Sequence, residues 1–244
     1  MKAGGRNTAT SAVVEGDTDA CAAEWKREGG PGRRVKRQVT VEGERPRPKR
    51  LCRRTKPGDA VVGDLAWSQI EMEDVVRYWD RLARQGCARS QYSLGVCYER
   101  GHGVRHDMRA AVKLWQAAAE SGHARAQFEL GKCLEKGSGV KRDLKAAVSW
   151  WRLAAEKGLA DAQHKMGVCL ESGLQVEKDM DAALRMYNLA VRQNHAGAQF
   201  DLGRCYEEGF AGLPKDKKEA ARLYRLAANQ GHLLARMASL YTMQ

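Results

Sequence analysis

The apolar positions of this chain recur with a period of 36 residues over most of its length. The string Leu-Gly-x-Cys, once with Met in place of Leu, occurs at residues 94–97, 130–133, 166–169 and 202–205. An aromatic residue follows each string at the same spacing, and only the last one is displaced by a single residue: Trp115, Trp151, Tyr187 and Tyr224. Self-similarity at a fixed period of this length predicts a stack of repeated supersecondary units.

Each unit predicts two helices, here called helix A and helix B. In helix A, Ala126, Leu130, Cys133 and Leu134 fall at i, i+4, i+7 and i+8, which makes one apolar stripe at helical period. Glycines such as Gly137 are expected to end helix A, because they adopt positive φ without strain. Aspartates are expected to cap helix B at its start: Asp107, Asp143, Asp179 and Asp216. Gly or Asn is expected to end it: Gly122, Gly158, Asn194 and Gly231.

These signals predict an all-α fold, an α-α superhelix (solenoid) of about four repeats, over residues 66–244. A lone helix B with a capping box from Ser68 to Glu71 precedes the first full unit. A degenerate helix A follows the last unit, as expected where an end repeat has only one neighbour. The expected segments are a half repeat at 68–86, repeats at 88–123, 124–159, 160–195 and 196–232, and a C-terminal capping helix at 233–244.

Residues 1–65 are predicted to be a disordered basic tail. They lack periodicity and hold too few large apolar side chains to offset the entropy of ordering, and Gly and Pro interrupt them. Two basic clusters, at 33–37 and 45–54, suggest a nuclear-import signal that would bind an import receptor. Contact with nucleic acid or anionic membrane through charge alone, or no specific role, are the alternatives. The import-signal candidates are Arg33, Arg34, Lys36, Arg37, Arg47, Lys49, Arg50, Arg53 and Arg54.

The net charge of +12 belongs mainly to this tail. Residues 1–60 hold 15 Lys and Arg against 8 Asp and Glu, and the rest of the chain is close to balanced. No run of 18 apolar residues predicts a transmembrane helix. Acidic residues near the start (Glu15, Asp17 and Asp19) argue against a targeting peptide. We therefore expect an intracellular protein, cytoplasmic and/or nuclear.

The repeated residues resemble the Sel-1-like repeat, a relative of the tetratricopeptide repeat. The unit at 124–159 matches the pattern almost in full, from Ala126 to Gly158, whereas the next unit departs from it at Gln175 and Asn194. The resemblance implies a non-enzymatic scaffold or adaptor that assembles protein complexes. The endoplasmic-reticulum adaptors of this family carry a signal sequence and a membrane anchor, which this sequence does not show.

The family resemblance also implies where a partner protein would bind, because helix A lines the concave surface of such solenoids. The stripe of helix A opposite its apolar stripe varies freely between units, as a specificity-determining surface would. We call this stripe the helix A face. Its members are Arg89, Ser93, Val96 and Arg100; Arg125, Glu129, Lys132 and Lys136; Asp161, Lys165, Val168 and Ser172; and Gly197, Asp201, Arg204 and Glu208. A merely solvated surface is the alternative.

The residue types that usually carry chemistry do not fall into a recognised pattern here. Cys97, Cys133, Cys169 and Cys205 occupy one equivalent position and are interpreted as small core residues. His102, His106, His123, His195 and His232 are interpreted as surface loop residues. We therefore expect no catalytic residues, no metal and no cofactor. A hydrolase, of the type claimed for cysteine-rich relatives, is the less favoured alternative.

Overall fold

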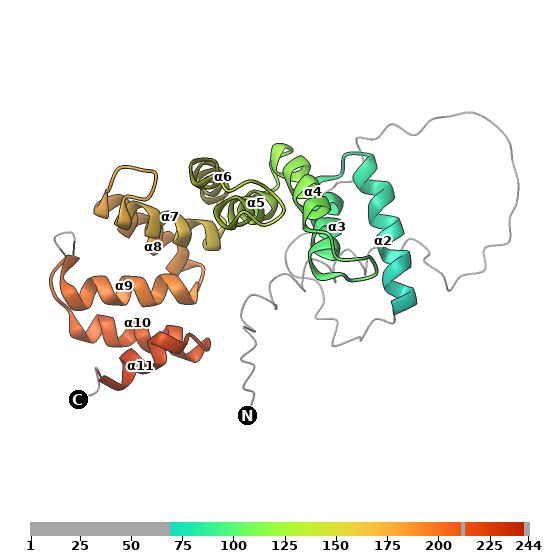
Figure 1. Ribbon diagram of the computed structural model, residues 1–244. Coiled ribbons are helices and arrows are strands. Elements are labelled where there is room, and N and C mark those ends of the chain that lie inside the picture. The colour runs from blue at the N-terminus through green and yellow to red at the C-terminus, as the bar shows by residue number, and fades with distance from the viewer. Residues whose placement is uncertain (1–68, 211–212, 242–244) are drawn as a thin grey trace, which may run out of the picture. The chain divides into compact units, whose positions relative to one another are not determined.

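The computed structural model describes residues 69–210 and 213–241, and these form ten helices and no strand (Figure 1). The predicted tail, including all nine import-signal candidates, and the capping residue Ser68 lie outside the described residues. The helices are α2 (Gln69–Arg84), α3 (Ala88–Arg100), α4 (Met108–Glu120), α5 (Ala124–Lys136), α6 (Leu144–Glu156), α7 (Ala160–Ser172), α8 (Met180–Arg192), α9 (Ala196–Glu208), α10 (Lys217–Asn229) and α11 (Leu233–Tyr241). Helices α3, α5, α7 and α9 are the predicted helices A, and α4, α6, α8 and α10 are the predicted helices B.

The chain divides into two compact units, Met1–Leu114 and Trp115–Gln244, which we call unit 1 and unit 2. In unit 1, α2 packs against α3 around a core that includes Val75, Trp79, Leu94 and Cys97. Helix α2 is thus a helix B that has no described helix A of its own, as its sequence predicts.

In unit 2 each helix packs on the next one along the chain, from α5 to α11. Figure 1 shows the last three, α9 to α11, lying side by side. The aromatic residue of each helix B is fully buried, with Trp151, Tyr187 and Tyr224 between 0% and 2% exposed. Cys133, Cys169 and Cys205 are also buried, which confirms that they are core residues.

In unit 2, the glycine of each of these periodic strings gives the aromatic ring its space. A Cβ atom on Gly131 would lie 2.6 Å from Cδ1 of Trp151, and a Cβ on Gly203 would lie 2.8 Å from Cε1 of Tyr224. Carbon atoms pack favourably at about 3.5–4.0 Å, so no side chain fits at these positions without displacing the ring. The periodic glycine in the middle of helix A is therefore required by packing.

The predicted helix caps are present. Oδ1 of Asp143 accepts from the backbone N–H of Ala146 at 2.9 Å, and Asp107, Asp179 and Asp216 cap their helices in the same way. Asp216 and Glu219 also have the spacing of a capping box, but only half of it is formed. The N–H of Glu219 binds Asp216, but the carboxylate of Glu219 pairs with Arg222 at 2.6 Å instead of reaching back to the cap.

Two loop positions where this chain lacks the expected glycine keep the glycine conformation. Gln175 and Asn194 have φ values of 56° and 61°, and they are the only residues other than glycine with positive φ in the described part of the chain. Asparagine tolerates this left-handed region well, whereas glutamine pays a steric cost there. The loop between α7 and α8 therefore keeps Gln175 at a positive φ that glutamine by itself disfavours.

A glutamine recurs in helix A and binds the end of the preceding helix B. The side chains of Gln91, Gln127 and Gln163 each donate to a backbone carbonyl eight residues earlier. In two repeats of unit 2, a second glutamine, just after the end of helix B, donates a hydrogen bond to the glutamine of helix A in the same repeat. Nε2 of Gln193 donates to Oε1 of Gln163, and Nε2 of Gln230 donates to Oε1 of Gln199, each at 2.8 Å.

The repeat at 124–159 lacks this second glutamine, and we expect Lys157→Gln to stabilise the protein by about 1 kcal/mol. Lys157 stands at the equivalent position, but its Nζ donates to the carbonyl of Gly122. Oε1 of Gln127, a residue only 3% exposed, is left without a hydrogen-bond partner among the described residues. Urea denaturation would measure the gain, and Lys157→Ala is the control, since it removes the lysine contact but supplies no amide. Equal stability of the glutamine variant and the wild type would contradict the expectation.

Candidate protein-binding face

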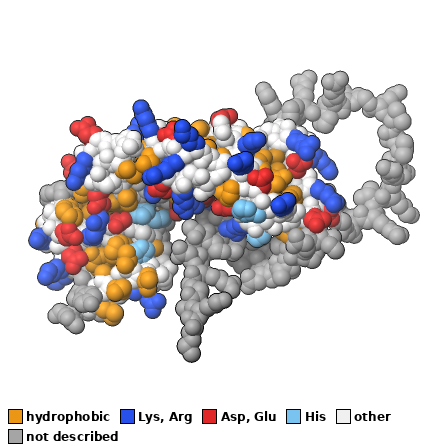
Figure 2. Space-filling view, in the orientation of Figure 1, with side chains coloured by type: hydrophobic (Ala, Val, Ile, Leu, Met, Phe, Trp, Pro, Cys, Tyr) orange, Lys and Arg blue, Asp and Glu red, His pale blue; other side chains and the backbone are white. Residues whose placement is uncertain are grey.

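The helix A face of unit 2 is partly exposed and highly polar. Arg125, Glu129, Lys132, Asp161 and Lys165 are partly buried, and Lys136 is exposed. Among the remaining members, Val168, Gly197, Asp201 and Arg204 are partly buried, and Ser172 and Glu208 are exposed. In Figure 2 the two signs of charge are interspersed over the surface in view. The face therefore presents alternating charges rather than a single-sign field.

In unit 1 the structure corrects the prediction for Ser93 and Val96. Their side chains are 0% and 2% exposed, so they lie inside the protein rather than on an open face. The reason is that the middle of α3 is covered all round, since Ser90 and residues 92–97 are all buried. A helix that is buried on every side has no solvated stripe. Of the four predicted members of the helix A face in α3, only Arg89 and Arg100 keep partial exposure.

Much of the helix A face in unit 2 is engaged in ion pairs, a feature that the sequence analysis missed. Nζ of Lys132 lies 2.7 Å from Glu129 on the same helix. Nζ of Lys165 lies 2.8 Å from Glu135 on the preceding helix A, and also 4.8 Å from the centre of the Trp151 ring. Lys165 therefore joins two successive repeats through a charge pair and a cation–π contact.

The densest network centres on Glu171 of α7. Its carboxylate accepts from the hydroxyl of Tyr187 and from the guanidinium of Arg204 on α9, each at 2.6 Å. Arg204 also lies 3.7 Å from Asp201. Burial raises the pKa of Tyr187 well above its usual range, and the hydrogen bond to Glu171 adds to this rise. Burial lowers the pKa of Arg204, but the charges of Glu171 and Asp201 outweigh that effect, so the pKa is raised overall.

This glutamate belongs to a periodic row that sequence reasoning could have found. Glu99, Glu135, Glu171 and Glu207 are spaced by 36 residues. Glu207 accepts from the hydroxyl of Tyr224 at 2.6 Å, as Glu171 does from Tyr187. Where helix B carries Trp151 instead, the indole N–H donates to the carbonyl of Phe128 at 3.3 Å, and Glu135 pairs with Lys165. Two members of the row, Glu171 and Glu207, are therefore structural acceptors for the buried tyrosines.

A group of histidines and carboxylates lies where the third and fourth repeats meet. Nε2 of His164 is 2.7 Å from Asp201, and Nε2 of His195 is 3.3 Å from Asp161. The two imidazole rings are 4.7 Å apart. The hydrogen bond from His195 lowers the pKa of Asp161, so this carboxylate stabilises the fold at neutral pH and loses that effect as the pH falls through its folded pKa.

His123, His195 and His232 lie in loops, as the sequence predicts, but they are partly buried rather than fully on the surface. Each caps a helix A: Nδ1 accepts the backbone N–H of Ala126, Ala198 or Ala235 at 3.1–3.2 Å. Histidine is not among the residues that commonly cap helices, so this role is hidden in the sequence. His232 also stacks on Phe200, and burial lowers its pKa.

The described residues contain no group of three or more His, Cys, Asp or Glu side chains arranged to hold a metal ion. None of the helices over 69–210 and 213–241 is long and apolar enough to cross a membrane. Four of the five described cysteines are buried, and Cys87 is partly buried. Burial raises the pKa of Cys205 to about 11 and that of Cys97 to about 12.

The sequence model of the Sel1 repeat matches residues 88–123, 124–159, 160–195 and 196–232. Among solved structures, the chain is similar to a Sel1 repeat protein from Oxalobacter formigenes, with 32% identity over 68% of this chain and 66% of that one, and a TM-score of 0.63. It is also similar to a protective antigen of uropathogenic Escherichia coli strains that displays an SLR fold, with 28% identity over 68% of this chain and 36% of that one, and a TM-score of 0.64. The chain thus spans less than two thirds of either protein. No curated protein matches it.

Proposed function

The chain belongs to the Sel1 repeat family, and from this premise we propose that it is a non-enzymatic scaffold that binds a partner protein through the helix A face. Such repeats typically serve as interaction scaffolds. A solenoid of this kind offers an extended surface whose residues change from repeat to repeat while its core stays constant. Binding therefore needs no chemistry beyond complementarity of shape and charge.

The observation that carries this proposal is the contrast between core and face within unit 2. The core repeats almost unchanged, with a glycine, a cysteine and a large ring at each level. On the helix A face, one set of equivalent positions holds Arg125, Asp161 and Gly197, and another holds Lys132, Val168 and Arg204. Variation confined to the partly exposed face is what recognition of one particular partner requires.

Aromatic side chains beside the charges add binding energy to this face. Phe128, His164 and Phe200 occupy one equivalent position in α5, α7 and α9, and all three are partly exposed. Aromatic residues are enriched among the residues that dominate protein–protein binding energy. Because the ion pairs hold the surrounding charged side chains in place, a partner would lose little side-chain entropy on binding there.

The test is a comparison of three full-length baits in a quantitative pull-down. The first is the wild type, and the second carries Arg125→Glu and Lys136→Glu on the helix A face. The third carries Lys145→Glu and Arg225→Glu, the same charge change on two exposed helix B residues. We expect partner proteins to be recovered with the first and third baits, and to be depleted at least about tenfold with the second, as loss of a few charge-assisted contacts predicts.

Equal recovery with all three baits would contradict binding by the helix A face. A fourth bait with Arg47, Lys49 and Arg50 replaced by alanine separates the alternative in which the basic tail is the active part. If only that bait loses its partner, or if the partner is nucleic acid, the tail carries the function. Thermal melting of each bait, matched to the wild type, confirms that the substitutions leave the fold intact.

A further inference from the structure

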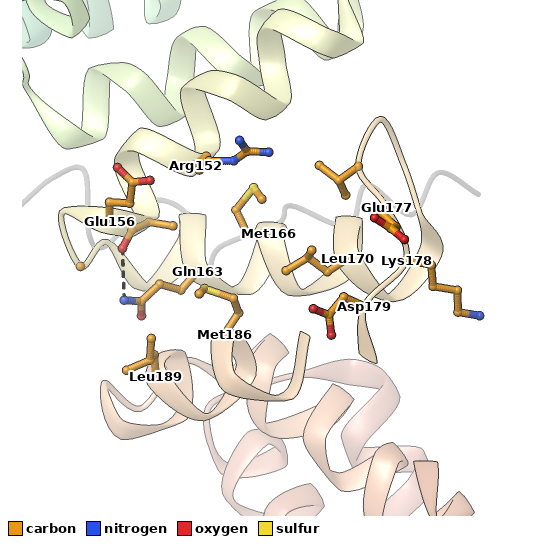
Figure 3. Close-up of a pocket in the computed structure, with 13 residues that line it drawn as sticks. Arg152, Glu156, Gln163, Met166, Leu170, Glu177, Lys178, Asp179, Met186 and Leu189 are labelled. Carbon is orange, nitrogen blue, oxygen red and sulfur yellow. Dashed lines mark hydrogen bonds between the residues drawn. The ribbon is translucent and has the colours of Figure 1, made fainter. Parts of the chain in front are cut away.

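A groove in unit 2 lies away from the helix A face. It has a volume of about 950 Å³ and is bounded by α6, α7, α8 and the loop between α7 and α8. Figure 3 shows Met166 and Leu170 of α7 at its floor, with Met186 and Leu189 of α8 on one side and Arg152 and Glu156 of α6 on the other. A volume of this size falls within the range of sites that bind a ligand or an anchoring segment.

The groove exists because its side chains are smaller or more exposed than the residues at the equivalent positions one repeat later. Leu170 is replaced by Tyr206 in the fourth repeat, and Ala155 is replaced by Val191. Met186 is only partly buried, whereas its counterpart Leu223 is 1% exposed and belongs to the apolar core. The space between α6 and α8 is therefore open, whereas one repeat later Val191 and Tyr206 pack against the core that contains Leu223.

Helix α11 presents the opposite feature, an apolar helix face that is not covered in this structure. Leu233, Met237 and Leu240 are 68%, 53% and 70% exposed, and their spacing of i, i+4 and i+7 puts them on one face. Leu234 beside them is 56% exposed. Figure 2 shows hydrophobic side chains gathered over α10 and α11. The opposite side of α11 packs on α10 through the fully buried Ala235.

This face cannot accept a further helix B in the geometry of the repeats. Leu240 occupies the position that is Gly131, Gly167 and Gly203 in the full repeats. At those positions even a Cβ atom would overlap the aromatic ring of helix B. A leucine there excludes such a ring, so a surface that covers α11 packs on it in another geometry, for example as a groove that receives the helix face.

We propose that the groove of one copy of this chain receives helix α11 of a second copy. The stripe from Leu233 to Leu240 spans about 10 Å, and its side chains are one helical turn apart. Met166 and Leu170 on the groove floor, and Met186 and Leu189 on its side, have the same one-turn spacing. Flexible methionines on both surfaces adapt well to such packing.

The charges of the two surfaces are complementary. The groove is lined by three acidic residues, Glu156, Glu177 and Asp179, and by two basic ones, Arg152 and Lys178. Helix α11 carries one charged residue, Arg236, which is exposed. A positive helix thus meets a groove with an excess of one negative charge. The contact joins two different surfaces, so it is heterologous and each copy can bind one neighbour at each surface.

The test measures the mass of the full-length chain by sedimentation velocity over a range of concentrations, at salt high enough to screen the basic tail. We expect the average mass to rise with concentration and to pass beyond that of a dimer. Leu240→Glu on α11 and Leu189→Glu in the groove should each weaken self-association about 10- to 100-fold, because each places an unpaired charge in an apolar contact. Both leucines are exposed, so neither change threatens folding.

Leu153→Glu is the matched control. Leu153 is the counterpart of Leu189 one repeat earlier and is equally exposed, at 41% against 39%, but it does not line the groove. This variant should associate like the wild type. An equal loss of association in this control would overturn the proposal, as would a chain that stays monomeric at every concentration.

Mixing the two defective variants gives the sharpest result. The Leu240→Glu chain keeps its groove and the Leu189→Glu chain keeps its α11, so together they should form a 1:1 complex that grows no further. If the mixture forms no complex, the two surfaces do not bind each other. If the Leu189→Glu chain alone dimerises as the wild type does, α11 pairs with another α11, and the groove is not its partner.

Discussion

Replacing Gly167 by alanine is expected to destabilise the protein by about 1–3 kcal/mol, the usual cost of overpacking a core. In an ordinary helix the same change stabilises by about 1 kcal/mol, because alanine restricts the unfolded chain and favours the helix. Here the new Cβ would lie 2.6 Å from Cδ1 of Tyr187, a ring that is fully buried. The ring cannot swing away, since Glu171 holds its hydroxyl at 2.6 Å. Urea denaturation followed by circular dichroism would measure the loss.

A second substitution, at Tyr187, shows whether the tyrosine ring causes the loss of stability expected for Gly167→Ala. In a Tyr187→Leu background the space beside Gly167 is empty of ring atoms, so the same alanine should cost much less there. The difference between the two backgrounds is the interaction energy of the cycle. If Gly167→Ala raises stability in the wild-type background, then helix propensity outweighs packing, and the explanation of the periodic glycine fails.

The second large effect is expected at Glu171, where Glu171→Ala should cost about 2–3 kcal/mol. The change removes the acceptor of a buried tyrosine hydroxyl and the anion that pairs with Arg204. A buried donor without a partner costs about 1–3 kcal/mol, and the partly exposed arginine adds a smaller amount because solvent screens it. The side chains of Glu171 and Arg204 are 20% and 35% exposed, so the pair counts as only partly buried.

Glu207→Ala is the matched control for this prediction. Glu207 holds the same place in the fourth repeat and accepts from Tyr224 at 2.6 Å, but it is exposed. Among the described residues, no arginine forms an ion pair with it as Arg204 does with Glu171. We expect a loss of about 1 kcal/mol there, as for one hydrogen bond close to solvent. Chemical denaturation of the two variants side by side gives the comparison. Equal losses at the two positions would show that Arg204 contributes nothing to the network.

The sequence predicts those features of the candidate site that depend only on helical period. It does not predict those that depend on which other parts of the protein pack nearby. The helix A face is predicted correctly as a partly exposed polar surface in unit 2, because helical period alone places those residues opposite the core. Ser93 fails the same prediction, because period says which residues share a face and not whether another part of the protein covers it. The link from Lys165 to Glu135 is likewise absent from the pattern, because it joins residues on different helices whose distance only packing determines.

The sequence by itself determined the four repeats, the helix pairs and the aspartate caps of the helices B. Those features are local: an aspartate finds the N–H groups of its own helix, and a glycine or Asn194 adopts positive φ within its own turn. The period of 36 also determined which residues are equivalent, and thereby the core. Only the tertiary structure decided what equivalent positions do differently, such as the open groove at Leu170 and Met186 where Tyr206 and Leu223 close it one repeat later. Such differences arise because the volume between helices is set by all the side chains that share it, and no single position encodes that sum.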